Sequence, residues 1–302
     1  MFTRLHALAL TALLAATAGS QADAAVIGFD PLGGAYGTVS IDNFTMSAGN
    51  ALGYQVNAPV GSIAPGTEFD LLYQAVVGAG TLEGQNQYFT PNNEITVVAR
   101  FPEVVTSLTP NLTGGFDASF ALGGTGDNYF QMYASGRNSS NLAGTGFDDG
   151  DLILEGRIVQ STGSFSTTTV GGSPTLFDQS GGDNYGGFQT LRGSGGSVVR
   201  VQITDYDPNY FVSGFDADAL LNFALFSGSN NTPFTNVNPS QQFAFAGVTP
   251  NRGAVNGEGE DFQFQADASV SFQVVPEPGS VAVFATLGII GLGGVVRRRR
   301  KA

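Results

Sequence analysis

Cysteine is absent from this 302-residue sequence, and histidine and lysine occur once each, as His6 and Lys301. Without cysteine, the chain can form no disulfide, zinc–thiolate site or iron–sulfur cluster. Because His6 and Lys301 stand near the two ends, the rest of the chain cannot build a Ser-His-Asp triad, a histidine-ligated metal site or a lysine Schiff base. Carboxylates, arginine, tyrosine and hydroxyl groups remain for chemistry.

Charged residues are few, at 12% of the chain, and they are unevenly distributed. Five of the 12 basic residues lie within residues 297–301, so residues 25–275 keep six arginines against 23 acidic residues, a formal charge of −17. A surface of that sign repels phosphate, and we expect no nucleic-acid partner. The apolar content of 42% indicates a folded chain instead of a disordered acidic one.

Residues 1–24 have the pattern of a secretory signal peptide. A short basic start is followed by an apolar run at residues 8–18, which is too short to span a membrane, and then by small residues. Ala22 and Ala24 fit a signal-peptidase cleavage site. An ordinary N-terminal helix is the alternative. With cleavage, the mature chain begins at Ala25 outside the cytoplasm.

Residues 275–302 contain three parts in order. The first is Val275-Pro276-Glu277-Pro278, the second is the charge-free stretch 279–296, and the third is Arg297, Arg298, Arg299, Arg300 and Lys301. The prolines predict a stiff hinge. As a transmembrane helix, residues 279–296 would be about 27 Å long, enough for the hydrocarbon core, and the positive-inside rule would keep the arginines in the cytoplasm.

This C-terminal arrangement resembles the PEP-CTERM sorting signal. The resemblance implies that an exosortase in the inner membrane recognises and processes the chain, which is held there transiently and then released or attached at the cell surface. A plain C-terminal membrane anchor has the same topology and is the alternative.

Residues 25–274 show the two-residue alternation of strands. Residues 261–274 alternate strictly between apolar and polar side chains, which predicts a long strand with one solvent-exposed face and antiparallel neighbours. Residues 216–226 fit either a short helix capped by Asp216 or a buried strand. Further predicted strands are residues 69–77, 94–101, 118–122, 129–134, 152–160, 198–204 and 242–248. We therefore expect an all-β body, an antiparallel β-sandwich or jelly-roll-like domain, flanked by a signal helix and one C-terminal transmembrane helix.

A second resemblance rests on four blocks of the body. They are residues 29–31 (FDP), 49–52 (GNAL), 94–99 (EITVVA) and 141–150 (NLAGTGFDDG). The chain is similar in these blocks to flocculation-associated PEP-CTERM proteins, which are extracellular proteins of floc-forming bacteria. The resemblance implies a role in floc or biofilm cohesion with exopolysaccharide and transfers no catalytic or binding residue.

Asp205, Asp207 and Asn209 have the spacing of the first ligands of a calcium loop, and Asp216 stands at its twelfth position. However, Tyr210 replaces the glycine of such a loop, and Asp216 replaces its bidentate glutamate. The alternative is a turn in which Asp and Asn side chains bond their own backbone.

Three functions fit these features. We expect first a secreted, non-enzymatic surface or matrix protein that contacts exopolysaccharide or cell-surface glycans and needs no cofactor. The second is a lectin-like module, with or without calcium, and the third a polysaccharide-degrading enzyme that uses two carboxylates. Aromatic residues that could stack on sugars, or belong to the core instead, are Tyr129, Phe130, Tyr133, Tyr185, Phe188 and Tyr206.

Overall fold

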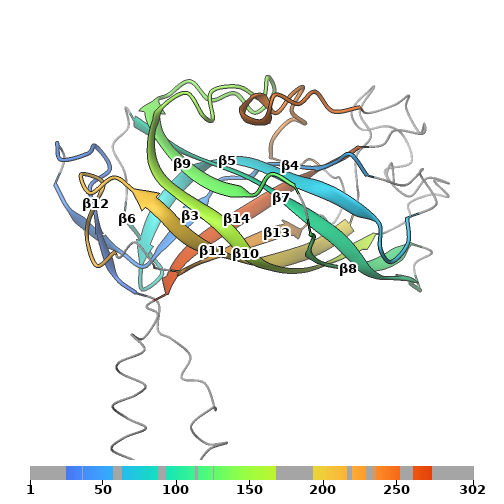
Figure 1. Cartoon of the computed structure of the whole chain (residues 1–302). Coiled ribbons are helices and arrows are strands. Elements are labelled where there is room, and N and C mark those ends of the chain that lie inside the picture. The colour runs from blue at the N-terminus through green and yellow to red at the C-terminus, as the bar shows by residue number, and fades with distance from the viewer. Residues whose placement is uncertain are drawn as a thin grey trace, which may run out of the picture. The chain divides into compact units, whose positions relative to one another are not determined.

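Strands occupy most of the part of this chain that the structure describes (Figure 1). The computed structural model describes residues 25–273, except residues 36, 57–62, 88–92, 113–114, 125, 168–192, 216–219, 229–233, 235 and 252–260. The strands are β1 (Ile27–Phe29), β2 (Val39–Ile41), β3 (Asn43–Met46), β4 (Gly49–Tyr54), β5 (Glu68–Leu82), β6 (Gln85–Gln87), β7 (Asn93–Pro110), β8 (Phe116–Leu122), β9 (Tyr129–Gly136), β10 (Asp151–Thr167), β11 (Gly193–Tyr206), β12 (Phe211–Ser213), β13 (Leu220–Gly228) and β14 (Phe262–Gln273). Among the described residues, the 3-10 turn η1 (Ala244–Ala246) is the one helical element, which confirms the all-β prediction.

The larger sheet has 11 strands, and its pairings form a closed circuit. Hydrogen-bonded neighbours follow the order β3-β5-β4-β14-β13-β11-β10-β8-β7-β9, with β6 beside β5. Because β7 also pairs with β5, the path from β5 through β4, β14, β13, β11, β10, β8 and β7 returns to its start. Every pairing whose register is described is antiparallel, as predicted.

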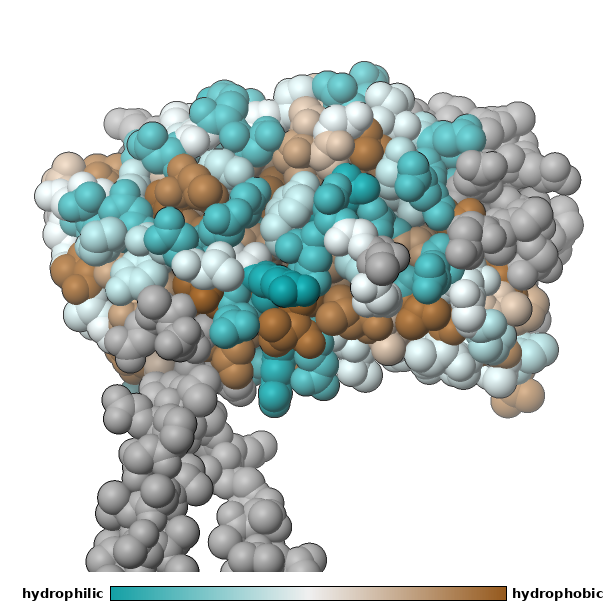
Figure 2. Space-filling view, in the orientation of Figure 1, coloured by the Kyte–Doolittle hydropathy of each residue, from teal (hydrophilic) through white to brown (hydrophobic). Residues whose placement is uncertain are grey.

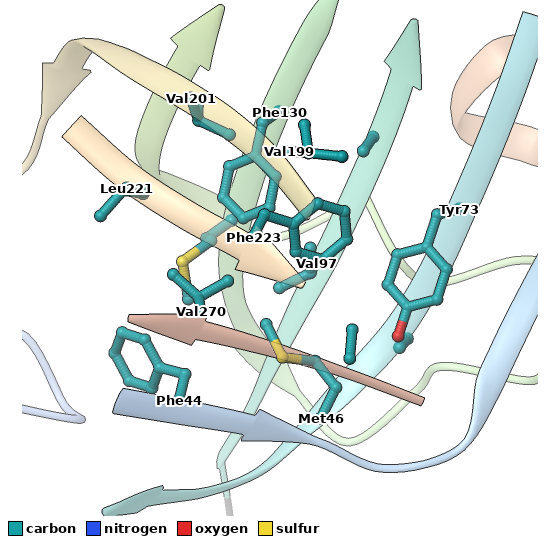
Figure 3. Packing of buried hydrophobic residues seen from close by; sticks show 14 of the residues in the cluster. Phe44, Met46, Tyr73, Val97, Phe130, Val199, Val201, Leu221, Phe223 and Val270 are labelled. Atoms are coloured by element: carbon teal, nitrogen blue, oxygen red, sulfur yellow. The ribbon is translucent and has the colours of Figure 1, made fainter. Parts of the chain in front are cut away.

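Side chains at alternate positions of these strands point into the circuit and form the main hydrophobic core. The inward residues of β5, each at most 6% exposed, are Phe69, Leu71, Tyr73, Ala75 and Val77. Figure 3 shows core side chains from strands far apart in sequence meeting one another. The rings of Tyr73 and Phe130 both pack against Phe223, with centroids 5.5 and 5.2 Å apart. Each fully buried large side chain contributes about 1.5–3 kcal/mol, so this core stabilises the closed circuit.

A three-stranded sheet, in the order β12-β1-β2, packs on the same core. The ring of Phe29 in β1 lies 5.1 Å from that of Phe44 in β3 and 5.3 Å from that of Phe211 in β12. The carboxylate of Asp30 accepts hydrogen bonds from the backbone N–H groups of Leu32 and Gly37, both at 2.8 Å. One aromatic cluster therefore links the two sheets.

Two predictions about local structure are resolved. Residues 216–226 fit a helix or a strand in the sequence, and the structure has the strand β13, which begins at Leu220. The strand predicted for residues 242–248 is wrong, because Phe243 and Val248 form one isolated bridge around η1. The side chains of Phe243 and Val248 are buried against Leu52 and Leu72. The apolar residues of this segment therefore serve the packing of a short turn and not a strand.

The strand predicted for residues 261–274 is present as β14, but its polar face is only partly exposed. Asp267 is exposed, whereas Asp261, Gln263 and Gln265 are 2%, 0% and 7% exposed. The prediction of a solvent-exposed face is therefore wrong for the first half of the strand. The physical reason is that residues 236–240 hydrogen-bond to Gln263 and Gln265.

The predictions on the chain ends lie outside the described residues. This applies to the cleavage residues Ala22 and Ala24, to residues 275–278, to the predicted transmembrane helix 279–296 and to the arginines 297–300. Within the described part of the chain, no helix is both long enough and apolar enough to cross a membrane.

One carboxylate points into the core. Glu103 takes the inward position of β7 between Phe101 and Val105, and it is 2% exposed. The hydroxyl of Ser161 in β10 donates a hydrogen bond to its Oε1 at 2.8 Å. Burial raises the pKa of Glu103 from 4.5 to about 7, against the smaller lowering effect of this hydrogen bond.

We predict that Glu103→Gln removes a pH-dependent loss of stability. Because the pKa of Glu103 is raised in the folded state, its contribution to stability is complete below pH 4.5 and is lost as the pH rises to about 7. Such a shift corresponds to about 3 kcal/mol. Urea unfolding below pH 4.5 and above pH 7 should show the variant gaining free energy of unfolding relative to the wild type as the pH rises.

The matched control is Glu83→Gln, which removes an exposed carboxylate on the turn after β5. A stability difference between Glu103→Gln and the wild type that stays constant across this pH range would contradict the prediction.

Candidate functional site

Two segments lie over the outward side of the larger sheet. One is residues 137–150, between β9 and β10, and the other is residues 236–251, before β14; Figure 1 shows them in green and orange above β4, β5 and β9. Leu52 and Leu72, on outward positions of β4 and β5, are fully buried beneath Phe243 and Val248. We call these two segments the cover.

A network of amide side chains holds the cover on the sheet. Asn50 of β4 donates to Asn141 Oδ1 at 3.2 Å and accepts from the backbone N–H of Ser240 at 2.9 Å. Gln74 of β5 donates to Ser240 Oγ at 2.9 Å, and Gln263 of β14 donates to the Ser240 carbonyl at 3.0 Å. All of these side chains except that of Asn141 are fully buried. Because buried amides are costly without partners, the network fixes one position of the cover.

The structure brings together three of the four sequence blocks singled out in the sequence analysis, namely residues 49–52, 94–99 and 141–150. Asn50 belongs to the second block and bonds Asn141 of the fourth. From the third block, the Thr96 hydroxyl donates to the Phe147 carbonyl at 2.7 Å, and Glu94 accepts from the Ser139 backbone at 3.0 Å. These blocks therefore contribute to the attachment of the cover.

Tyrosines stand at the edge of the cover. Tyr129 and Tyr133 occupy outward positions of β9 and are partly exposed, whereas Phe130 between them is in the core. The ring of Phe245, from the cover, meets that of Tyr129 edge to face with centroids 6.4 Å apart. Burial raises the pKa of Tyr129 to about 12. Of the other aromatic candidates, Tyr206 packs against the core, and Tyr185 and Phe188 lie outside the described residues.

Arg100 forms both ion pairs found among the described residues. Its Nη2 lies 2.7 Å from Asp70 Oδ2, and its Nη1 lies 3.0 Å from Asp127 Oδ2. Its guanidinium carbon is 6.0 Å from the centre of the Tyr54 ring. Desolvation lowers the pKa of Arg100, but the hydrogen bond and the charges of the two aspartates outweigh it, and the pKa is raised. This arginine is thus already shared by two carboxylates.

Further carboxylates lie next to Tyr133. Its hydroxyl donates to Gln131 Oε1 at 3.0 Å, and Gln131 Nε2 donates to Glu155 Oε1 at 2.8 Å. Burial raises the pKa of Tyr133, and the charges of Asp148 and Glu155 add to this effect. Asp205 of β11 stands directly across from Glu155 in the pairing of β10 with β11.

We call these side chains the aromatic–acidic face. Its members are Tyr54, Tyr129, Tyr133, Phe245, Gln131, Asp148, Glu155 and Asp205. The face combines partly exposed rings with carboxylates that form no ion pair with an arginine of the described residues. At the margin of the face, Arg100 is paired with Asp70 and Asp127, which are not members of it.

The predicted calcium ligands lie in a turn that uses them for its own backbone. Asp207 Oδ1 accepts from the N–H and the side-chain amide of Asn209, at 2.8 and 2.9 Å, and Asp205 Oδ1 accepts from the backbone of Tyr206 at 2.9 Å. Asp216 lies outside the described residues. Within the described ranges, no three acidic or histidine side chains gather closely enough to hold a metal ion. The calcium loop stays a prediction without geometric support.

Comparison with protein-family models, curated proteins and solved structures found no match to this chain.

We predict that Ser240→Ala loosens the cover. The change removes the acceptor of Gln74 Nε2, and Gln74 Oε1 already has no hydrogen-bond partner, so a fully buried amide would lose its remaining bond. We expect a loss of about 1–3 kcal/mol in the free energy of unfolding. Backbone amides of the cover, such as those of Gln241 and Ala244, should exchange hydrogen faster.

Ser164→Ala, which changes an exposed serine of β10, is the matched control. If Ser240→Ala left both stability and hydrogen exchange at the level of this control, the network would not hold the cover.

Proposed function

We propose that this protein is exported, held transiently in the inner membrane by its C-terminal segment, processed by an exosortase, and placed at the bacterial surface or in the extracellular matrix. There it would promote floc or biofilm cohesion by contacting exopolysaccharide or cell-surface glycans. In this proposal the protein is not an enzyme and requires no cofactor.

One observation carries the proposal, namely the order of Val275-Pro276-Glu277-Pro278, the charge-free residues 279–296, and the arginines 297–300. Each part has a physical role in sorting. The prolines prevent a helix from continuing into the body, the apolar stretch matches the bilayer, and the arginines favour the cytoplasmic side. The signal-peptide pattern at residues 1–24 supports the same route.

The body supports the proposal as a scaffold. We infer that the closed circuit of strands is a flattened, sandwich-like body of the jelly-roll kind, whose outer surface makes the contacts. The formal charge of −17 on residues 25–275 favours neutral or cationic partners over anionic ones.

A lectin-like function is the second candidate. It is favoured by the aromatic–acidic face, in which Tyr129 and Tyr133 present partly exposed rings beside hydrogen-bonding groups. Aromatic rings with a polar neighbour suit ligands that have one apolar and one polar side, such as sugar rings.

We predict that the chain is cut at or near the Pro276–Pro278 hinge. In cells with exosortase, the intact mass of the exported protein should lack the arginine tail, because the hinge lies just outside the membrane. In cells without exosortase, the uncut chain should accumulate in the inner-membrane fraction. Full-length protein in the inner membrane at steady state in both strains would contradict the sorting signal and support a plain membrane anchor.

We further predict that deleting the gene makes cells grow dispersed while polysaccharide secretion continues. In the proposed role, the protein holds cells together through many weak surface contacts. Because it takes no part in polysaccharide synthesis, secretion should continue without it. Settling rate and secreted-sugar content of the culture measure the two effects. An unchanged settling rate in the deletion strain would contradict the proposed function.

A further inference from the structure

We propose that the aromatic–acidic face binds a polysaccharide with free amino groups, that is, a glycan of amino sugars without N-acetylation. This inference rests on the proposed function and deepens it, because it names the chemistry of the glycan.

Tyr129, Tyr133 and Phe245 lie on one side of the sheet at the edge of the cover, and all three are partly exposed. Tyr129 is kept in place by Phe245, and Tyr133 by its hydrogen bond to Gln131 at 3.0 Å. Rings that are already fixed lose little conformational entropy on binding, and they offer flat apolar surface to the C–H side of a sugar.

Glu155 and Asp205 stand directly opposite each other on β10 and β11, and Asp148 lies close to Tyr133. Like charges placed opposite each other across two strands are destabilising unless a positive group lies between them. An ammonium group of the ligand would relieve this repulsion and form charge-assisted hydrogen bonds.

The basic side chains nearby form no ion pair with the carboxylates of the face. Arg100 is taken up by Asp70 and Asp127, with N–O distances of 2.7 and 3.0 Å. Arg157, two residues from Glu155 on β10, forms no ion pair with the described residues. The face therefore keeps an excess of carboxylates that would repel a uronate polymer.

No three carboxylates of the described residues gather into a metal-binding cluster, so the negative charge is spread along the face. A spread charge suits repeated ammonium groups on a polymer better than a single metal ion. An ammonium group can also lie over a tyrosine ring, a contact that a neutral sugar lacks. A basic protein could also bind the carboxylates, but its binding would not require the row of aromatic rings.

The test uses the full chain purified in detergent and measures binding to four probes by calorimetry. The probes are glucosamine hexamer, N-acetylglucosamine hexamer, an oligogalacturonate and polylysine. We expect the glucosamine hexamer to bind roughly tenfold more tightly than its N-acetylated form, and the oligogalacturonate not to bind.

Two sets of variants separate stacking from charge. Tyr133→Ala should weaken glucosamine-hexamer binding roughly tenfold, whereas Tyr133→Phe, which keeps the ring, should retain most of it. Asp148→Asn combined with Glu155→Gln should remove most of the preference for free amino groups. Glu83→Gln, which makes the same charge change on the turn after β5, is the control. If Tyr133→Ala does not fold, the charge variants still decide.

Equal affinity for the two hexamers would overturn the inference. Polylysine binding as tight as that of the glucosamine hexamer, and unaffected by Tyr133→Ala, would also overturn it and leave only non-specific attraction. The binding assay does not depend on the settling assay. Loss of settling in the deletion strain without glucosamine-hexamer binding would retain the proposed function and reject this site. Binding of the glucosamine hexamer without any effect of the deletion on settling would retain this site and reject the proposed function.

Discussion

The burial of amide side chains on the outside of a sheet is the constraint on which the rest of this structure depends. Asn50 and Gln263 are fully buried, and an amide without partners in such a position would cost several kcal/mol. Their partners come from Ser240 and Asn141, which belong to segments far away in the sequence. The observed position of the cover makes these hydrogen bonds, and it also places Phe245 beside Tyr129.

The closed circuit of strands solves a second problem, which arises from the composition. A chain with 12% charged residues and 42% apolar residues has few charges with which to protect an open sheet edge. The pairing of β7 with β5 completes the circuit, so the long central strands have partners on both sides. Within the cover, the two segments lie backbone against backbone. Gly144 has a positive φ of 74° and touches the Gln242 backbone, so a larger residue there would clash.

The two-residue alternation was sufficient to predict most strands, because burial on the inner side of the circuit imposes that period. It could not predict what covers the outer side. Gln263 and Gln265 have the polar character of exposed positions, and only their being amides instead of charged groups hinted at burial. Part of the candidate site could be predicted from the sequence. Tyr129 and Tyr133 could be named from the sequence, whereas Phe245 and Asp205 join them through contacts between residues distant in the chain.

The distribution of charge connects the two proposals. The basic residues of the chain are concentrated in its last residues, and the body keeps a formal charge of −17. In the proposed route, the basic cluster stays on the cytoplasmic side and is removed, so that processing would leave a body repelled by the anionic membrane surface. In this proposal, a body of that sign would be drawn instead to positive groups in the matrix. Arg100 is paired with Asp70 and Asp127, and the carboxylates beside Tyr133 form no ion pair with it. In these proposals, removal of the basic tail and a preference for amino sugars would both follow from one asymmetry in the sequence.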